Sequence, residues 1–311
     1  MRIVILGGSG LVGRGLAESW ASDGHAVTIV CRHPEKASPV QRGVDIVGWD
    51  GRTTAGWADR LDGADAVVSL AGETIGGTNL GQIFFQRWSI GKKRRILESR
   101  VNAGRAVVDA IGSARVKPGV LLQMSAVGVY GPHGDEPVDE KSPAGKDFLA
   151  HVCIEWERST EPVEAMGVRR VVVRTGLVLS LEGGLFPVIL LPFRLFVGGP
   201  LGSGRQGFSW IHAEDHRRAL RFLVEDSRAG GVYNVTAPEP VSNTELGRQL
   251  ARALHRPYWF PTPAPLLKLI LGEKATLVLD GQHVAPRRLL ERGFSFHQPT
   301  LAAALAGLLR R

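Results

Sequence analysis

The sequence predicts an α/β protein, with a doubly wound parallel sheet and a smaller, mostly helical C-terminal substrate lobe. Three observations support this class. Short apolar, β-branched runs alternate with longer helical patterns in the first half of the chain. The strand runs are almost continuously apolar, as in a sheet that helices cover on both faces. After Thr175 the alternation stops, and glycine-rich loops begin.

The elements of the first half come in the order that parallel strands require, with a helical crossover between successive strands. Such crossovers are right-handed, which fixes how the units wind. The patterns predict strands at 3–6, 27–30, 66–70, 120–124 and 171–174, and helices at 11–21, 96–111 and 148–166.

The changes of pattern divide the chain into three parts. Residues 1–175 are expected to form a cofactor-binding domain, to which strands return from 205–240. Residues 176–256 supply the substrate lobe. Residues 257–311 are expected to form a helical cap over the ligand edge of the sheet, with helices at 266–271, 275–279, 286–292 and 300–309.

Composition favours a folded, soluble protein of a reducing compartment. Of the 311 residues, 44% are hydrophobic and 22% are charged, which argues against disorder. Cys31 and Cys153 have neither the number nor the spacing of a disulfide framework or zinc site, and no metal is expected. A strand begins at Arg2 without a leader segment, and prolines interrupt the apolar stretch 185–197. We therefore expect a cytoplasmic protein without a membrane span.

The formal net charge of +8 favours anionic partners. Basic residues are spread along the chain except for the run 92–95, which has no interleaved aromatic residues and no DNA-reading motif. We interpret this run as a solvated or ligand-facing helix end. The alternative hypothesis of a nucleic-acid-associated protein rests on charge alone. Steep salt dependence of DNA binding would favour it. A small-molecule substrate and a homodimer are the partners that we consider.

A glycine motif follows the first predicted strand, where a helix begins. Gly7 allows a tight turn, Gly10 lets the backbone approach a pyrophosphate, and Gly13 lets helix and strand pack closely. Loops without a ligand also contain such trios, but the strand before and the helix after this one predict a Rossmann-type dinucleotide site. The free N–H groups of the helix N-terminus would face the phosphates. The predicted loop also includes Ser9, Leu11 and Val12.

The end of the second strand distinguishes NADP from NAD. A site for NAD has an acidic residue there on the ribose hydroxyls, whereas this chain has Cys31 and Arg32. A guanidinium can bind a 2′-phosphate through charge-assisted hydrogen bonds, so we expect NADP(H); the alternative is a surface arginine that ends a strand. The strand predicted at 66–70, which we count as the fourth of the sheet, ends at Leu70 and is followed by Ala71 and Gly72. These small residues would let the cofactor pass close to the backbone, or would simply make a tight turn.

These motifs, together with Ser125–Gly131, make the chain resemble extended short-chain dehydrogenases/reductases of the NAD-dependent epimerase/dehydratase type. More narrowly, it is similar to the atypical "epimerase family protein" group, which has a C-terminal domain of unknown function. This resemblance covers nearly the whole chain. Its further motifs are Trp88 with 92–100, 156–157, 174–179, 198–206, 210–212 with Asp215, 281–286 and 293–294.

The resemblance implies residues that hold NADP. Beyond the glycine loop, these are Arg32 at the end of strand two and Leu70 and Ala71 after strand four. The resemblance adds Arg100 on the long helix that follows, and Leu177 after an Arg-Thr-Gly turn.

The sequence departs from this resemblance at the catalytic residues. Ordinary members use Tyr-x-x-x-Lys on the helix after strand five, in which the lysine lowers the pKa of the tyrosine. No such motif occurs in this sequence, and the pair would fall near His151 and Glu155. Ser125, at the end of strand five, and Tyr130, in the turn after it, are the catalytic candidates that remain. The alternatives are a backbone cap for Ser125 and a packing role for Tyr130.

The glycine-rich stretch 198–206, with Trp210, His212 and Asp215, resembles the substrate loop of sugar-nucleotide enzymes. Trp210 would suit a flat or hydroxylated ligand, and Arg205 an anionic one. The alternative is a structural loop in which Asp215 caps the next helix.

The leading hypothesis is therefore an NADP(H)-dependent oxidoreductase, or an isomerase of the epimerase type. Its substrate would be a small carbonyl or hydroxyl compound, with nucleotide-linked sugars among the candidates. The alternative is an NADP(H)-binding sensor or regulator without turnover, because the Tyr-x-x-x-Lys relay is missing.

Overall fold

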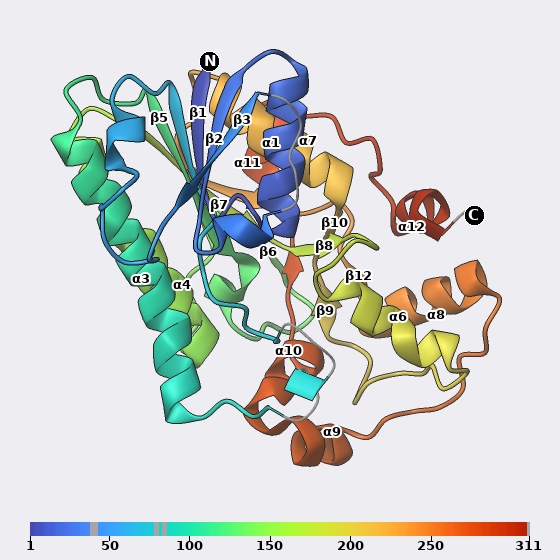
Figure 1. Cartoon of the computed structure of the whole chain (residues 1–311). Coiled ribbons are helices and arrows are strands. Elements are labelled where there is room, and N and C mark those ends of the chain that lie inside the picture. Colours follow the sequence, from blue (N-terminus) through green and yellow to red (C-terminus); the bar gives the residue numbers. More distant parts are fainter. Residues whose placement is uncertain (38–42, 78–80, 83–85, 310–311) are drawn as a thin grey trace.

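A seven-stranded parallel sheet forms the centre of the computed structural model, which describes residues 1–37, 43–77, 81–82 and 86–309 (Figure 1). The strand order is β11-β7-β5-β4-β1-β2-β3. This is the order of a Rossmann sheet extended by one strand, so the predicted doubly wound fold is confirmed. The strands are Arg2–Leu6 (β1), Ala26–Cys31 (β2), Val44–Gly48 (β3), Ala66–Ser69 (β4), Val120–Ala126 (β5), Arg169–Thr175 (β7) and Gly231–Val235 (β11).

Helices cover both faces of the sheet (Figure 1). Ile3 and Ile5 of β1 pack in one hydrophobic core with α1 and α7, and Val4 and Leu6 pack in the other with α3 and α5. Each strand is therefore buried on both sides, which explains the continuous apolar runs. The helices are Leu11–Ser22 (α1), Ile90–Ser113 (α3), Phe148–Arg158 (α4), Pro162–Ala165 (α5) and Ala213–Glu225 (α7), with short 3-10 helices at Pro34–Lys36 (η1), Ala58–Leu61 (η2) and Val127–Tyr130 (η3).

Two features of this domain differ from the pattern in the sequence. The helix predicted at 148–166 is two helices, α4 and α5, and Pro162 begins the second because proline fits the first turn of a helix. The edge strand β3 was not among the predicted strands. Its residues are only partly buried and include the exposed Asp45, so they do not form an apolar run.

The part of the chain in which the sequence predicts the substrate lobe consists of short elements after β7. The helix α7, which follows β10 and packs on the sheet, is capped by His212, whose Nδ1 accepts a hydrogen bond from the Glu214 N–H. Asp215 is not the cap, because its buried carboxylate accepts hydrogen bonds from the N–H groups of His297 and Gln298. The elements of the lobe are Leu177–Leu179 (β8), Phe186–Arg194 (α6), Gly207–Phe208 (β9), Trp210–His212 (β10), Val241–Ser242 (β12) and Asn243–Leu254 (α8).

The C-terminal segments contact several parts of the molecule (Figure 1). The segment Ala264–Leu279 lies on the side of the sheet where the strands end, and α12 packs on α8. In addition, α11 packs on β11, and β13 pairs with Pro137–Val138 (β6). The elements are Ala264–Leu271 (α9), Gly272–Ala275 (η4), Thr276–Leu279 (α10), His283–Val284 (β13), Arg287–Glu291 (α11) and Leu301–Leu309 (α12). Among the described residues, no helix has the length and apolar character needed to cross a membrane.

Candidate functional site

The loop after β1 presents its backbone at the carboxyl edge of the sheet. Gly7 has a φ of +79°, which favours glycine, and a Cβ there would lie 3.0 Å from the backbone of Ala71. A Cβ on Gly13 would lie 2.5 Å from the Gly8 Cα, so α1 packs directly on the loop. Gly10 is the N-cap of α1 and provides no capping side chain. The N–H groups of the first helical turn are thus available to an anion such as a pyrophosphate.

A cavity of about 210 Å³ adjoins the ends of β2, β3 and β4. The predicted residues Arg32, Ala71 and Gly72 line it together. Arg32 is exposed, and none of the described residues forms a hydrogen bond or ion pair with its guanidinium. A Cβ on Gly51 would lie 3.4 Å from the Arg32 Cδ, so the side chain rests on the loop after β3. The residues present fit a phosphorylated dinucleotide, because a free guanidinium and free helix N–H groups lie at one edge of the sheet.

The cavity also has lining residues that the sequence patterns did not reveal. Two of the acidic lining residues already have partners. Asp50 accepts hydrogen bonds from Thr53, which lower the pKa of its carboxyl, and Glu73 forms an ion pair with Lys92. Because strands end at a common edge, a prediction of β3 would have pointed to the residues after it. The lining residues that were missed are Trp49, Asp50, Gly51, Arg52, Glu73, Glu98, Ser99 and Asn102, whereas Arg95 belongs to the run 92–95 that we interpreted as a solvated or ligand-facing helix end.

Beyond the glycine loop, four of the predicted cofactor residues do not line this cavity, and the first of them, Leu70, packs against the hydrophobic core instead. Cys31 is buried, and its side chain packs in the core beneath α1. Arg100 is also buried; it donates hydrogen bonds to the carbonyl oxygens of Glu73, at 3.0 Å, and Ile96, at 2.9 Å. Leu177 packs against the core of the substrate lobe. Arg100 therefore supports the loop that contains Gly72, whose added Cβ would lie 3.1 Å from its guanidinium carbon.

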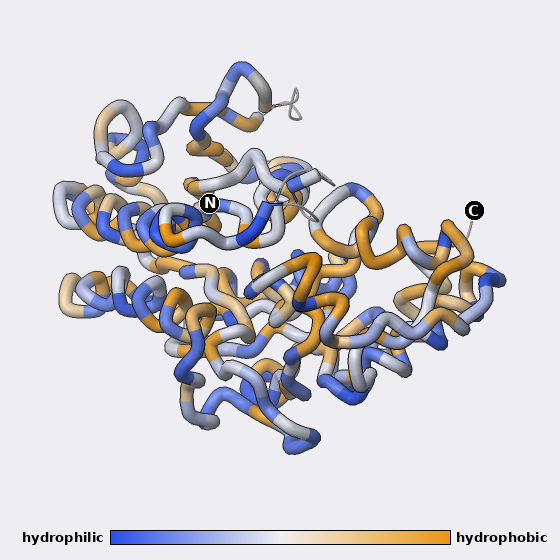
Figure 2. Tube along the Cα trace, turned by 90° about the horizontal axis from the view of Figure 1, so that it is seen from below, coloured by the Kyte–Doolittle hydropathy of each residue, from blue (hydrophilic) through white to orange (hydrophobic). Residues whose placement is uncertain are grey.

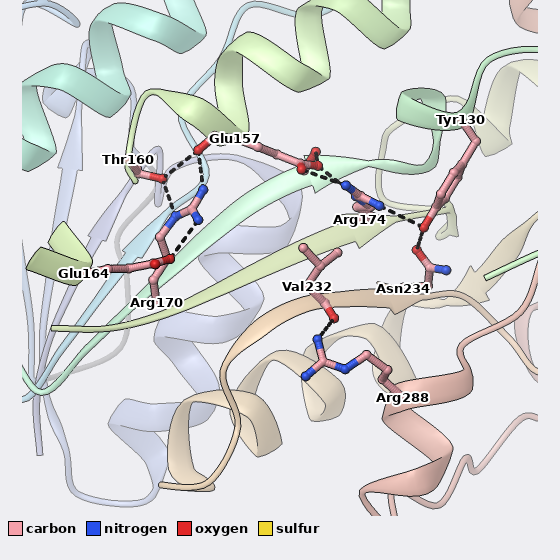
Figure 3. A network of polar contacts seen from close by, with 10 residues as sticks. Tyr130, Glu157, Thr160, Glu164, Arg170, Arg174, Val232, Asn234 and Arg288 are labelled. Carbon is pink, nitrogen blue, oxygen red and sulfur yellow. Dashed lines mark hydrogen bonds and ion pairs between the residues drawn. The ribbon is translucent and has the colours of Figure 1, made fainter. Parts of the chain in front are cut away.

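Ser125 and Tyr130 belong to a buried polar network, part of which is drawn in Figure 3. Strand register places Ser125 of β5, Arg174 of β7 and Asn234 of β11 side by side. Arg174 donates to both carboxylate oxygens of Glu157, each at 2.9 Å, and to the Tyr130 hydroxyl at 3.1 Å. Ser125 Oγ donates to Glu157 at 2.6 Å, and the Tyr130 hydroxyl donates to Asn234 Oδ1 at 2.7 Å. Both candidate hydroxyl groups thus have protein partners.

Burial shifts the pKa values of two groups in and beside this network, and ion pairing shifts that of a third. It raises the pKa of Tyr130, and the nearby Arg174 only partly opposes the effect, so the phenol is protonated at neutral pH. Burial also raises the pKa of the Cys153 thiol, to about 11. Although burial opposes it, the hydrogen bonds and charge of Glu157 raise the pKa of Arg174. The network therefore favours a neutral phenol beside a charged Arg174–Glu157 pair.

On α4, where the Tyr-x-x-x-Lys pair would lie, His151 and Glu155 do not replace it. His151 is exposed, and Glu155 pairs with Arg158 at 3.0 Å. The sequence contains neither a tyrosine nor a lysine at these positions.

The glycine-rich loop of the substrate lobe is mostly tied to the protein itself. Trp210 is fully buried and donates a hydrogen bond to the Glu239 carbonyl, so it packs the lobe instead of contacting a ligand. Gln206 donates to the carbonyl oxygens of Leu201 and Val278. Arg205 is exposed and pairs with Asp135 at 2.7 Å. Of the side chains considered for substrate contact, Arg205 is exposed and His212 is partly buried, whereas Trp210 and Asp215 are buried.

Comparison with known proteins identifies relatives over the whole length of the chain. The model of the NAD dependent epimerase/dehydratase family matches residues 3–236, and that of a domain of unknown function, DUF1731, matches residues 262–308. The epimerase family protein YfhF of Bacillus subtilis is 37% identical over 310 residues, which span 99% of this chain and 98% of that protein.

Two solved structures are also similar. Human epimerase family protein SDR39U1 (isoform 2), solved with NADPH, is 34% identical with a TM-score of 0.86, covering 99% of both chains. A nucleoside-diphosphate sugar epimerase from Corynebacterium glutamicum is 32% identical with a TM-score of 0.78, covering 99% of this chain and 58% of the other.

Proposed function

Because the chain belongs to the NAD-dependent epimerase/dehydratase family, we propose that it is an NADP(H)-dependent oxidoreductase or epimerase of a small carbonyl or hydroxyl compound. The observation that carries the cofactor choice is Arg32, an unpaired guanidinium in the cavity at the end of β2. The NADPH in the similar human structure supports the same choice. Nucleotide-linked sugars are the first substrates to test, given the name of the similar epimerase.

The residues of this chain have distinct roles in the proposal. The first turn of α1 and the glycine loop bind the pyrophosphate, and Arg32 binds the 2′-phosphate. Arg100 positions the backbone at Gly72, along which the cofactor passes. NADPH itself supplies the hydride, so the protein contributes binding, orientation and electrostatics.

Proton transfer distinguishes this site from that of the usual relay enzymes. In those enzymes a lysine lowers the pKa of the catalytic tyrosine, whereas burial raises the pKa of Tyr130 here. The Ser125 proton points at Glu157, so Ser125 is already engaged as a donor. Any turnover is therefore slow and independent of a tyrosinate, and positioning of cofactor and substrate supplies most of the rate enhancement.

A second candidate function is NADP(H) sensing without turnover. The observation that favours it is that Ser125 and Tyr130 both direct their hydroxyl groups to protein partners. Such a protein would bind the cofactor and transfer no hydride.

Two measurements separate these functions. NADPH fluorescence titration gives the dissociation constant. Single-turnover absorbance at high protein concentration detects hydride transfer, with NADPH for small aldehydes and ketones and with NADP+ for the hydroxyl groups of UDP-sugars. Binding with oxidation of NADPH or reduction of NADP+ supports the enzyme, whereas binding without either reaction for any compound of the panel supports the sensor. Absence of NADP(H) binding at millimolar concentration would contradict both.

A further inference from the structure

A second cavity, of about 340 Å³, lies between α6, α8 and α9, and none of its lining residues lines the cofactor cavity. Its wall is almost entirely apolar: of the lining side chains, those of Asn243 and Thr262 alone carry polar groups. The Asn243 side-chain oxygen already accepts a hydrogen bond from the Leu201 N–H. The apolar wall includes Ile189, Phe193, Leu246, Leu250, Leu267 and Val278.

A cavity of this kind is unfavourable when empty. Apolar side chains that face water in a partly open cavity forgo hydrophobic stabilisation, and a ligand that covers them gains about 25 cal/mol per Å² of buried apolar surface. Water would gain little there, since it needs several polar partners. An engineered apolar cavity of about 150 Å³ in another protein stays dry and takes up benzene. A volume near 340 Å³ lies within the range of small-molecule sites, about 300 to 1,000 Å³.

One wall of the cavity is the helix α9, whose outer side remains largely exposed among the described residues. All residues of α9 except Lys268 are apolar, yet none of them is fully buried. Leu267 faces the cavity, whereas Leu269 is 69% exposed. Apolar side chains of α9 therefore lie both on the wall of the cavity and at the exposed surface beside it.

Exposed aromatic residues lie beside this wall. Trp259 and Phe196 are each more than half exposed, and Phe260 lines the cavity while remaining exposed. Phe196 has a φ of +64°, which is strained for a bulky residue; such strain gathers at ligand sites. The Trp259 indole N–H donates to the Phe196 carbonyl at 2.8 Å and holds this conformation. In Figure 2 the apolar stretches, in orange, gather in the half of the tube that carries the C-terminal end.

The apolar surface is bordered by positive charge. The Arg256 guanidinium lies 4.4 Å from the centre of the Phe196 ring. Arg194 follows the lining residue Phe193, and Lys268 follows Leu267; all three basic residues are exposed. An anionic head group at the surface would therefore meet complementary charge.

From these features we propose that the cavity binds one molecule of a small anionic amphiphile, such as a medium-chain carboxylate. The hydrocarbon chain lies between α6, α8 and α9, and the carboxylate lies at the surface near Arg194, Arg256 and Lys268. The site is separate from the cofactor cavity, so the proposal stands whether or not NADP(H) is the cofactor.

Isothermal titration of the full chain with dodecanoate, below its micelle concentration, tests the proposal. One molecule should bind per chain, with a negative heat-capacity change from apolar burial. Dodecyltrimethylammonium has the same chain and the opposite charge, and it should bind about tenfold more weakly or worse. Equal affinity for the two probes would overturn the anionic head group. Absence of saturable dodecanoate binding would overturn the site.

A matched pair of substitutions on α9 tests whether the ligand binds inside the cavity or on the outer surface. Leu267→Trp fills the cavity and should weaken dodecanoate binding by about tenfold or more, whereas Leu269→Trp makes the same change outside it and should alter binding less than about twofold. Val278→Trp, which changes a lining residue on α10, is the second filling variant if Leu267→Trp does not fold, as judged by circular dichroism. Equal weakening by Leu267→Trp and Leu269→Trp would mean adsorption to the outer surface. Sedimentation of the wild type and of Leu269→Trp at increasing protein concentration completes the test. If the wild type forms a dimer that Leu269→Trp dissociates, and dodecanoate does not bind, a second copy of the chain covers this surface.

Discussion

Tyr130 shows how one buried side chain can combine packing with polar contacts. Its ring is buried, its hydroxyl donates to Asn234, and it accepts a hydrogen bond from Arg174. The sequence left open whether this tyrosine is catalytic or a packing residue. Burial keeps its phenol protonated, which favours a structural contribution through the network over proton abstraction.

Replacing Tyr130 by phenylalanine tests this contribution. The change removes the donor to the Asn234 side-chain oxygen and one of the acceptors of Arg174, which keeps Glu157, so the free energy of unfolding should fall by about 1 to 3 kcal/mol. NADPH affinity and any NADPH-dependent turnover should persist in Tyr130→Phe. Urea unfolding and steady-state kinetics measure the two effects. Unchanged stability together with a large loss of turnover would contradict the structural role and identify Tyr130 as catalytic.

His216, on α7, makes stability depend on pH. Its ring is fully buried beside the Thr175 hydroxyl, at 3.1 Å, and burial lowers its pKa from 6.5 to about 4. The unfolded chain therefore takes up a proton at higher pH than the folded chain. The stability that the neutral ring provides is complete above pH 6.5 and is lost as the pH falls toward 4. A shift of this size corresponds to about 3 kcal/mol.

The measurement compares urea unfolding at pH 7 and pH 4 for the wild type and for His216→Gln. Glutamine retains a polar side chain and does not titrate, so the variant should lose less stability on acidification. The titration of all other groups is shared by the two proteins and cancels in the comparison. An identical loss in both proteins would show that His216 does not cause the pH dependence.

At the scale of elements, the C-terminal segments complete cores that the rest of the chain leaves open. Phe294 packs in the core of α1 and α7, Leu301 and Leu305 pack with α8, and Val284 packs beside Tyr130. The apolar residues of α9, by contrast, remain partly exposed. The tail is thus tied to the molecule mainly through β13, α11 and α12.

Deletion of the residues after Arg256 should therefore prevent folding into a soluble protein. Five buried apolar side chains larger than alanine, those of Val284, Leu289, Phe294, Leu301 and Leu305, would be lost. At roughly 1.5 to 3 kcal/mol each, their burial amounts to about 7 to 15 kcal/mol, comparable to the whole stability of a typical domain, about 5 to 15 kcal/mol. Size-exclusion chromatography and dye binding would reveal aggregation and exposed apolar surface. A soluble truncated chain with unchanged thermal stability would show that the tail is an independent appendage.

The parts of the site that could be predicted are those with local signals. The turn from β1 into α1 has its glycines in sequence, and Arg32, Ala71 and Gly72 line one cavity because parallel strands end at one edge. The network around Arg174 could not be predicted in this way. It depends on register between β5, β7 and β11, and on Glu157 reaching across from α4. No local pattern encodes such contacts between distant segments.

At the scale of the whole molecule, the strand ends collect the groups that suit a dinucleotide, and the lobe beyond them holds a separate apolar cavity. The positive charge of the chain is consistent with anionic ligands at both places. The molecule therefore has two candidate binding sites of different chemistry. The first ligand is NADP(H) in our proposal, and the proposed activity depends on it.

Dissociation constants for NADPH and NADH, in the wild type and in Arg32→Asp, test that claim most directly. Hydrogen bonds to a charged group contribute about 1.5 to 3 kcal/mol, and solvent screening at the exposed Arg32 points to the lower end, a preference of about tenfold for NADPH. Arg248→Asp, on α8 and outside the cofactor cavity, makes the same change of charge and should keep the preference. We predict that Arg32→Asp abolishes or reverses it. Equal affinities in the wild type, or a preference for NADPH that survives Arg32→Asp, would contradict the assignment.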